Sequence, residues 1–153
     1  MEQITIRESR FDDPAVQALI ALTMAELSAR YGGSGDDTPV AAADFAPPTG
    51  AFLVAEGPDG RLIGCAGWRA HGSDAELKRM FTIEAARGKG VARRVLAAIE
   101  DSARERGYKR VILETGDKQP EAIALYEKCG YERIEDFGYY KGQPGVLSYA
   151  RVL

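Results

Sequence analysis

The first half of the chain carries both strand-like and helix-like patterns of apolar side chains. Residues 3–8 alternate between apolar and polar side chains, which predicts a strand. Residues 14–30 repeat apolar side chains every three or four positions, which predicts an amphipathic helix. Asp13, followed by a proline, favours a helix start at this point. Residues 40–45 predict one further helix. It is short, because prolines stop it soon afterwards.

Three strand-like runs follow, at residues 51–56, 62–70 and 75–83. Turn-forming residues separate them, with Gly-Pro-Asp-Gly at 57–60 and His-Gly-Ser-Asp at 71–74. Short connections of this kind join antiparallel neighbours in a sheet. The three runs therefore predict an antiparallel meander.

Helix-like and strand-like runs alternate in the second half of the chain. The runs are a helix at 91–106, a strand at 110–115, a helix at 120–128, and strands at 131–136 and 146–152. Gly107 and Gly130 mark the ends of the two helices. We find no internal repeat and no linker. The order of elements predicts a single α/β or α+β domain over residues 1–153.

Charge and hydropathy narrow the possible functions. The net charge is −3, from 20 basic and 23 acidic residues. Binding to nucleic acid needs a basic excess, so we expect no nucleic-acid partner. No apolar run approaches the roughly 18 residues of a membrane span, and the polar start of the chain does not resemble a signal peptide. We therefore expect a cytoplasmic protein with no membrane partner.

Residues that bind transition metals are scarce. His71 is the only histidine, and Cys65 and Cys129 are the only cysteines. The two cysteines form no Cys-x-x-Cys pair and lie away from the histidine in the sequence. We expect no metal site, and we expect both thiols to be free in a reducing cytosol.

A basic, glycine-rich turn precedes the helix that begins at Val91. It reads Arg-Gly-Lys-Gly over residues 87–90. The first backbone N–H groups of a helix have no partner within it, so such a turn favours phosphate binding. The sequence lacks a Walker A string, and Arg93 stands where a dinucleotide fingerprint needs its third glycine. A solvated turn without a ligand is the alternative.

The same turn resembles the R/Q-x-x-G-x-G/A motif of the GCN5-related N-acetyltransferases (GNATs). Residues 76–83 (ELKRMFTI) resemble the fourth strand of that family, and residues 125–131 (LYEKCGY) resemble its L-Y-x-x-x-G-[FY] signature. The order of strands and helices also agrees over almost the whole chain. The resemblance implies a single-domain GNAT fold, with a mixed, mostly antiparallel sheet of six to seven strands and about four flanking helices.

The resemblance also implies an activity. A GNAT enzyme is an acetyl-CoA-dependent N-acetyltransferase, in which an amine attacks the thioester directly. The acceptor would be an amine of a small molecule or a peptide, and no metal takes part. A non-catalytic acyl-CoA-binding or regulatory module on the same fold is the alternative. The sequence leaves open whether the chain forms a homodimer.

By the same resemblance, the turn grips the pyrophosphate of acetyl-CoA. The residues that match the motif are Arg87, Gly88, Lys89, Gly90, Val91 and Ala92. Backbone groups of Met80, Phe81 and Ile83 would pair with the pantetheine arm, because the fourth strand of the family splays from the fifth. Gln119 stands where many members carry an asparagine that binds pantetheine or the acceptor.

Tyr126 matches the tyrosine that protonates the leaving thiolate in many GNAT members. A phenol with a pKa near 10 suits that step. Packing is the alternative role, because Tyr126 shares a helical face with Ala122, Leu125 and Cys129. The loops that line the acceptor site in the family correspond to residues 31–38 and 137–145.

Glu76 is the candidate general base, because several members place a glutamate on the fourth strand. An ion pair with Lys78 or with a charge on a neighbouring strand is the alternative role. Strict alternation places Glu76, Lys78 and Met80 on one face of the strand and Leu77, Arg79 and Phe81 on the other. A β-bulge would change this assignment of faces.

Overall fold

The computed structural model describes residues 3–33 and 36–153, so Ser34 and Gly35 of the predicted acceptor loop lie outside the described residues. The strands are β1 (Thr5–Ser9), β2 (Gly50–Glu56), β3 (Leu62–His71), β4 (Asp74–Thr82), β5 (Arg110–Gly116), β6 (Glu132–Ile134) and β7 (Val146–Val152). The helices are α1 (Pro14–Tyr31), α2 (Val91–Glu105) and α3 (Pro120–Lys128), with 3₁₀ turns η1 (Ala42–Phe45) and η2 (Glu84–Ala86).

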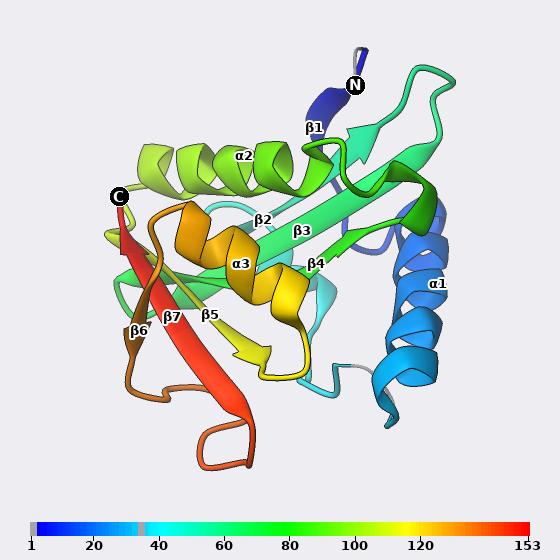
Figure 1. Cartoon of the computed structure of the whole chain (residues 1–153). Helices are drawn as coiled ribbons and strands as arrows, with labels where there is room; N and C mark the ends of the chain where they lie inside the picture. The colour runs from blue at the N-terminus through cyan, green and yellow to red at the C-terminus, as the bar shows by residue number, and fades with distance from the viewer. Residues whose placement is uncertain (1–2, 34–35) are drawn as a thin grey trace.

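The seven strands form one sheet in the order β1-β2-β3-β4-β5-β7-β6 (Figure 1). Every neighbouring pair is antiparallel except β4 and β5, which are parallel. Helices α2 and α3 cover one face of the sheet, and α1 packs against the other. The predicted mixed sheet and α/β fold class are therefore confirmed. The short helix predicted over residues 40–45 is the 3₁₀ turn η1.

Strands β4 and β5 pair over only two positions, Ala75 with Val111 and Glu76 with Ile112. Beyond these positions the two strands diverge, although β4 stays paired with β3 and β5 stays paired with β7. The sheet therefore opens into a gap between the carboxyl-terminal halves of β4 and β5. Ligands of open α/β sheets commonly bind beyond the carboxyl ends of such strands.

A β-bulge in β4 changes which side chains face the gap. Cys65 pairs with Phe81, but Gly67 pairs with Lys78, so β4 carries one more residue than β3 across this interval. Arg79 lies within the bulge and has a left-handed φ of 56°, which is unusual for a residue other than glycine. The predicted strict alternation is therefore wrong beyond Lys78.

The extra residue moves Arg79 onto the face of Glu76 and Lys78. Arg79 and Lys78 both bond to the segment that follows α1, Arg79 through the carbonyl of Thr38 at 2.9 Å. Met80 instead packs with the core below α2, as Leu77 does. Phe81 packs with the core below α1.

Helix α2 follows the predicted pattern of apolar residues. Val91, Val95, Ile99 and Ala103 are all buried against the sheet. Gly90 precedes the helix with a left-handed φ of 80°. In the part of the chain that the structure describes, no helix is long and apolar enough to cross a membrane.

Candidate active site

A cavity of about 450 Å³ fills the gap between β4 and β5. Four of the residues that line it come from segments far apart in the sequence. Met80 lies on β4, Glu114 on β5, Tyr126 on α3 and Tyr140 in the loop between β6 and β7. Gln119, directly before α3, also lines the cavity. The fold therefore brings Met80, Gln119 and Tyr126, all predicted from the sequence, to one cavity.

The turn before α2 presents free backbone donors. The first intrahelical bond runs from the N–H of Arg94 to the carbonyl of Gly90, so the N–H groups that precede Arg94 in the helix have no partner within it. Gly88 and Gly90 have φ values of +76° and +80°, which glycine adopts without strain. A Cβ at either position would meet no atom of the described protein within 4 Å. This open, cationic helix start fits a pyrophosphate group.

Arg87 is held beside this turn by α1 and β4. Its guanidinium pairs with Glu26 of α1, and its Nε donates to the carbonyl of Thr82 at 3.3 Å. Lys89 is exposed on the turn, while Val91 is 1% exposed and anchors the helix in the core. Ala92 lies beside Val91 on the first turn and is partly buried.

Tyr126 combines burial with a hydroxyl that is free to act in the cavity. The residue is 7% exposed, and its ring packs at 5.8 Å from Tyr131 and at 6.4 Å from Tyr149, measured between ring centroids. Among the described residues, none forms a hydrogen bond with its hydroxyl. Burial raises the pKa of Tyr126 above its ordinary value of 10.0. The phenol is therefore protonated across the physiological pH range and can donate a proton.

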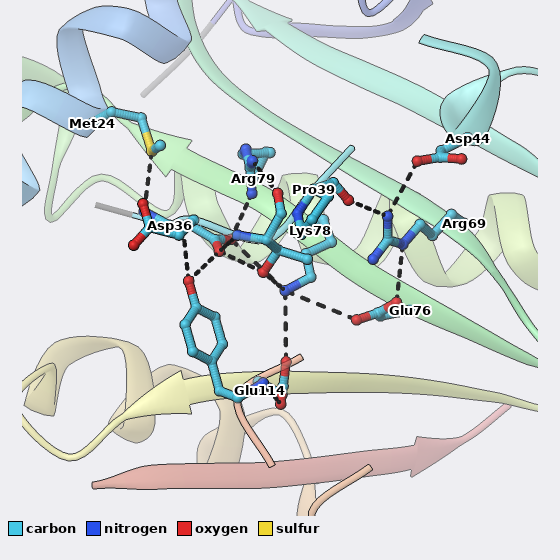
Figure 2. A network of polar contacts seen from close by, with 12 residues as sticks. Met24, Asp36, Pro39, Asp44, Arg69, Glu76, Lys78, Arg79 and Glu114 are labelled. Carbon is cyan, nitrogen blue, oxygen red and sulfur yellow. Dashed lines mark hydrogen bonds and ion pairs between the residues drawn. The ribbon is translucent and has the colours of Figure 1, made fainter. Parts of the chain in front are cut away.

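Asp36 ties three segments together beside the cavity (Figure 2). Its carboxylate accepts from Arg79 at 2.7 Å, from the hydroxyl of Tyr140 at 2.7 Å and from the hydroxyl of Thr38 at 2.6 Å. Burial opposes ionisation of this carboxyl, but the charge of Lys78 and these hydrogen bonds outweigh it, so the pKa of Asp36 lies below its ordinary value. The predicted acceptor loops are thus joined to each other and to β4.

Glu114 is the carboxylate buried most deeply in the cavity wall. Its side chain is 2% exposed. Oε2 accepts the backbone N–H of Tyr140 at 3.0 Å, whereas Oε1 has no hydrogen-bond partner within the described chain. The ammonium of Lys78 lies 3.7 Å from Oε1, beyond hydrogen-bonding distance. Burial raises the pKa of Glu114, and the charges of Glu76 and Asp36 raise it further against the opposing effect of Lys78.

Comparison with known proteins agrees with this geometry. The model of the acetyltransferase (GNAT) family matches residues 17–131. The chain belongs to the GNAT family. An "IAA acetyltransferase" of Azospirillum brasilense is 37% identical, and the match covers 94% of each chain. The uncharacterised N-acetyltransferase YjgM of Escherichia coli is 34% identical, over 88% of this chain and 83% of that protein.

Solved structures of other GNAT proteins share the fold. An acyl-CoA N-acyltransferase of Klebsiella pneumoniae superposes with a TM-score of 0.81 at 29% identity, covering 99% of this chain and 98% of the other. A GNAT acetyltransferase of Elizabethkingia anophelis, solved with acetyl-CoA bound, superposes with a TM-score of 0.72 at 18% identity. That match covers the whole of both chains.

One backbone contact implied for this GNAT protein needs correction. The N–H of Ile83 donates to Ile63 at 3.0 Å and its carbonyl accepts from Ala86, so both polar groups of Ile83 are already paired. Bonding directions alternate along an antiparallel strand, so the backbone of Phe81 also points toward β3, although Phe81 lines the cavity. The carbonyl of Thr82, on the opposite edge of the strand, accepts from Nε of Arg87.

Glu76 does not line the cavity of this GNAT protein. Its Oε1 lies 3.0 Å from Nε of Arg69, which is its cross-strand neighbour, and its Oε2 lies 3.8 Å from the ammonium of Lys78. Both ion pairs that the sequence left open as an alternative role are therefore present. The cavity contains Glu114 instead, which the sequence placed only at the end of a strand bordering the cleft. Its signal was an acidic residue directly after the apolar run at residues 111–113 of β5.

We expect Asp36→Asn to destabilise the GNAT domain at neutral pH by about 1–3 kcal/mol, because it removes charged hydrogen bonds. The pKa of Asp36 is lowered by folding, so its contribution is present above the ordinary value of 3.8 and is lost as the pH falls below it. Thermal melts at pH 7 and pH 3.5 should show a gap from the wild type that narrows in acid. An equal gap at both pH values would contradict this role.

Among the residues that the structure describes, no cluster of three or more histidine, cysteine, aspartate or glutamate side chains is arranged to hold a metal ion. Cys65 and Cys129 are free thiols. Cys65 is buried in the core, which raises the pKa of its thiol to about 12. Its position is that of a packing residue.

Proposed function

We propose that this GNAT protein transfers an acetyl group from acetyl-CoA to an amine of a small molecule or peptide, by direct attack of the amine on the thioester. One observation carries the proposal. The hydroxyl of Tyr126, which is unbonded within the described chain, belongs to a residue that lines the cavity between β4 and β5, and the open, left-handed glycine turn before α2 follows β4 in the chain. Strand β4 thus leads from the wall of the cavity toward the turn that we assign to the phosphates.

The chain offers groups that fit each part of acetyl-CoA. The free N–H groups at the start of α2, with Arg87 and Lys89, suit the pyrophosphate. The backbone of Met80, which lines the cavity, suits the amides of the pantetheine arm, and the side chain of Gln119 can donate or accept a further bond. No metal is needed for this recognition.

Acetyl-CoA supplies an activated acyl group as a thioester. Met80 follows the bulge in β4, and we assign its backbone N–H to the carbonyl oxygen of that thioester, where negative charge develops. Tyr126 donates its proton to the sulfur that leaves. A general acid in this position contributes about 10²–10⁴-fold to the rate.

The alternative, a non-catalytic acyl-CoA-binding module, requires no proton donor at the cavity. Retention of the unbonded Tyr126 hydroxyl in the cavity wall favours catalysis over binding alone. A location in the cytoplasm and assembly into a homodimer stay predictions.

The experiment that tests the function is an acetyl-transfer screen. Purified protein is mixed with acetyl-CoA and a panel of primary amines, polyamines, amino acids and short peptides, and thiol release is followed. We expect release above the hydrolysis background with at least one class of amine, and a product heavier by one acetyl group in the mass spectrum. Coenzyme A binding by calorimetry without turnover on any amine would favour the binding module.

A further inference from the structure

Tyr140 connects β5 to the segment that follows α1. Its backbone N–H donates to Oε2 of Glu114, on β5, at 3.0 Å. Its hydroxyl donates to Oδ1 of Asp36 at 2.7 Å and accepts the backbone N–H of Asp37 at 2.7 Å. The loop between β6 and β7 is therefore held at both ends of one tyrosine side chain.

Asp36 continues this connection to β4 (Figure 2). Its Oδ2 accepts from the guanidinium of Arg79 at 2.7 Å, and the same guanidinium donates to the carbonyl of Thr38 at 2.9 Å. One chain of contacts thus runs from β5 to β4, and we name it the Tyr140 bridge: Glu114, Tyr140, Asp36 and Arg79. All four residues line the cavity, so the bridge is a part of the cavity wall that spans from one strand to the other.

The β-bulge in β4 brings Arg79 into the Tyr140 bridge. Strict alternation would place Arg79 on the face of Leu77, which packs below α2, and away from Asp36. The bulge instead holds Arg79 at a left-handed φ of 56°, which residues other than glycine rarely adopt. Such backbone strain persists only where the surrounding contacts fix it, and it is concentrated at functional sites. The strained residue therefore points to a function for the bridge.

The Tyr140 bridge lies on the face of the sheet away from the groups that we assign to acetyl-CoA. The start of α2 and Tyr126 of α3 belong to the face that these two helices cover. Arg79 bonds to the segment after α1, and α1 packs against the opposite face. Because the proposed cofactor groups occupy one face, the acceptor amine has to approach the thioester from the other, past the bridge.

Resting on the proposed acetyl transfer, we propose that the Tyr140 bridge selects acceptors by size, so that the substrates are compact small-molecule amines rather than peptides. A compact amine passes beside the closed bridge. A peptide has to lead its backbone out of the cavity across the line from β5 to β4 that Tyr140 occupies. The cavity of about 450 Å³ has the size of a site for one small molecule, and the acetyl end of the cofactor fills part of it.

The protonation states of the Tyr140 bridge favour its closed form at neutral pH. Burial and the hydrogen bond to Asp36 raise the pKa of Tyr140 to about 12, so the phenol keeps the proton that it donates. Despite burial, the charge of Lys78 and hydrogen bonds hold the pKa of Asp36 below its ordinary value of 3.8. A hydrogen bond to a charged group corresponds to about 10–100-fold in an equilibrium constant, which is the penalty for an acceptor that needs the bridge open.

The test compares the fastest compact amine of the screen with the same amine extended at its far end by a triglycine amide. In the wild type, kcat/KM should be at least about 10-fold lower for the extended amine. Tyr140→Phe keeps the ring but loses both bonds of the hydroxyl. The ratio of kcat/KM for the extended amine to that for the compact amine should therefore rise about 10–100-fold.

Two further variants make the comparison specific. Tyr139→Phe removes a phenol hydroxyl one residue away, from a side chain that is 54% exposed and does not line the cavity. The ratio should be unchanged in this control. Asp36→Asn keeps an oxygen acceptor but loses the charge that Tyr140 and Arg79 share, so its ratio should rise in the same direction as that of Tyr140→Phe.

Hydrogen exchange measures the Tyr140 bridge without turnover. The backbone N–H of Asp37 donates to the hydroxyl of Tyr140, so opening of the bridge limits its exchange. Measured by NMR, this N–H should exchange about 10-fold or more faster in Tyr140→Phe than in the wild type. Equal exchange rates in the two proteins would show that the bridge is not closed in solution and would overturn the proposal.

The failures are distinguishable. A wild type that is silent on every amine rejects the acetyl transfer and the selection of acceptors with it. A wild type that acetylates the extended amine as fast as the compact one rejects the size selection and leaves the acetyl transfer standing. A ratio that stays constant in Tyr140→Phe, or rises equally in Tyr139→Phe, removes the Tyr140 bridge from acceptor selection.

Discussion

Replacing Gly90 by valine is expected to abolish coenzyme A binding while the domain stays folded. The φ of +80° at this position is costly for a β-branched residue, by about 1–2 kcal/mol, so the turn would rearrange and redirect the N–H groups at the start of α2. Losing two charge-assisted hydrogen bonds, at about 1.5–3 kcal/mol each, lowers affinity by at least about 100-fold. Isothermal titration with coenzyme A measures the loss.

Gly107, at the other end of α2, provides the matched control. It has a φ of +85°, and a Cβ there would likewise meet no described atom within 4 Å. Gly107→Val should therefore cost about as much stability, about 2–4 °C in melting temperature per kcal/mol, yet leave coenzyme A binding intact. Equal affinities in the two variants would remove the turn before α2 from the cofactor site.

The sequence predicted the turn well because its conformation is local. Gly88 and Gly90 adopt left-handed φ values that the loop before α2 requires by itself. Val91 is buried, as the spacing of apolar residues along the start of α2 predicts. The strands of the meander were predicted for the same reason, since two-residue alternation and short turns are properties of neighbouring residues. Such features need no knowledge of what packs against them.

The bulge in β4 could not be predicted because its partners are remote in sequence. Arg79 is held in its left-handed conformation while its guanidinium pairs with Asp36, 43 residues earlier in the chain. The bulge exchanges the faces of Arg79 and Met80, so alternation alone assigns each of these side chains to the wrong face of the sheet.

Glu114 was missed for a related reason. Its significance lies in a missing hydrogen bond: among the described residues, Oε1 has no hydrogen-bond partner, and the ammonium of Lys78 stays 3.7 Å away. A sequence shows which groups are polar, but burial and the lack of a partner exist only after folding. Glu76, by contrast, satisfied the motif and is paired on both oxygens.

Tyr126→Phe is expected to lower kcat by about 10²-fold or more and to leave coenzyme A affinity unchanged, because it removes the general acid and keeps the ring. The hydroxyl forms no hydrogen bond within the described chain, so its loss should not reduce stability. Since burial raises the pKa of Tyr126 above 10.0, wild-type kcat should show no loss of this acid below that pH. Steady-state kinetics with the best amine of the screen, together with thermal melts, measure both effects.

Tyr131→Phe removes a neighbouring hydroxyl with the opposite expected effects. The hydroxyl of Tyr131 donates to Glu100 at 2.7 Å, and its removal should cost about 1.5–3 kcal/mol of stability with kcat retained. The rings of the two tyrosines pack together. If disturbed packing caused the rate loss, kcat would therefore fall together with the melting temperature in both variants. A folded Tyr126→Phe with full turnover would make Tyr126 a packing residue, and solvent would then be the source of the proton for the thiolate.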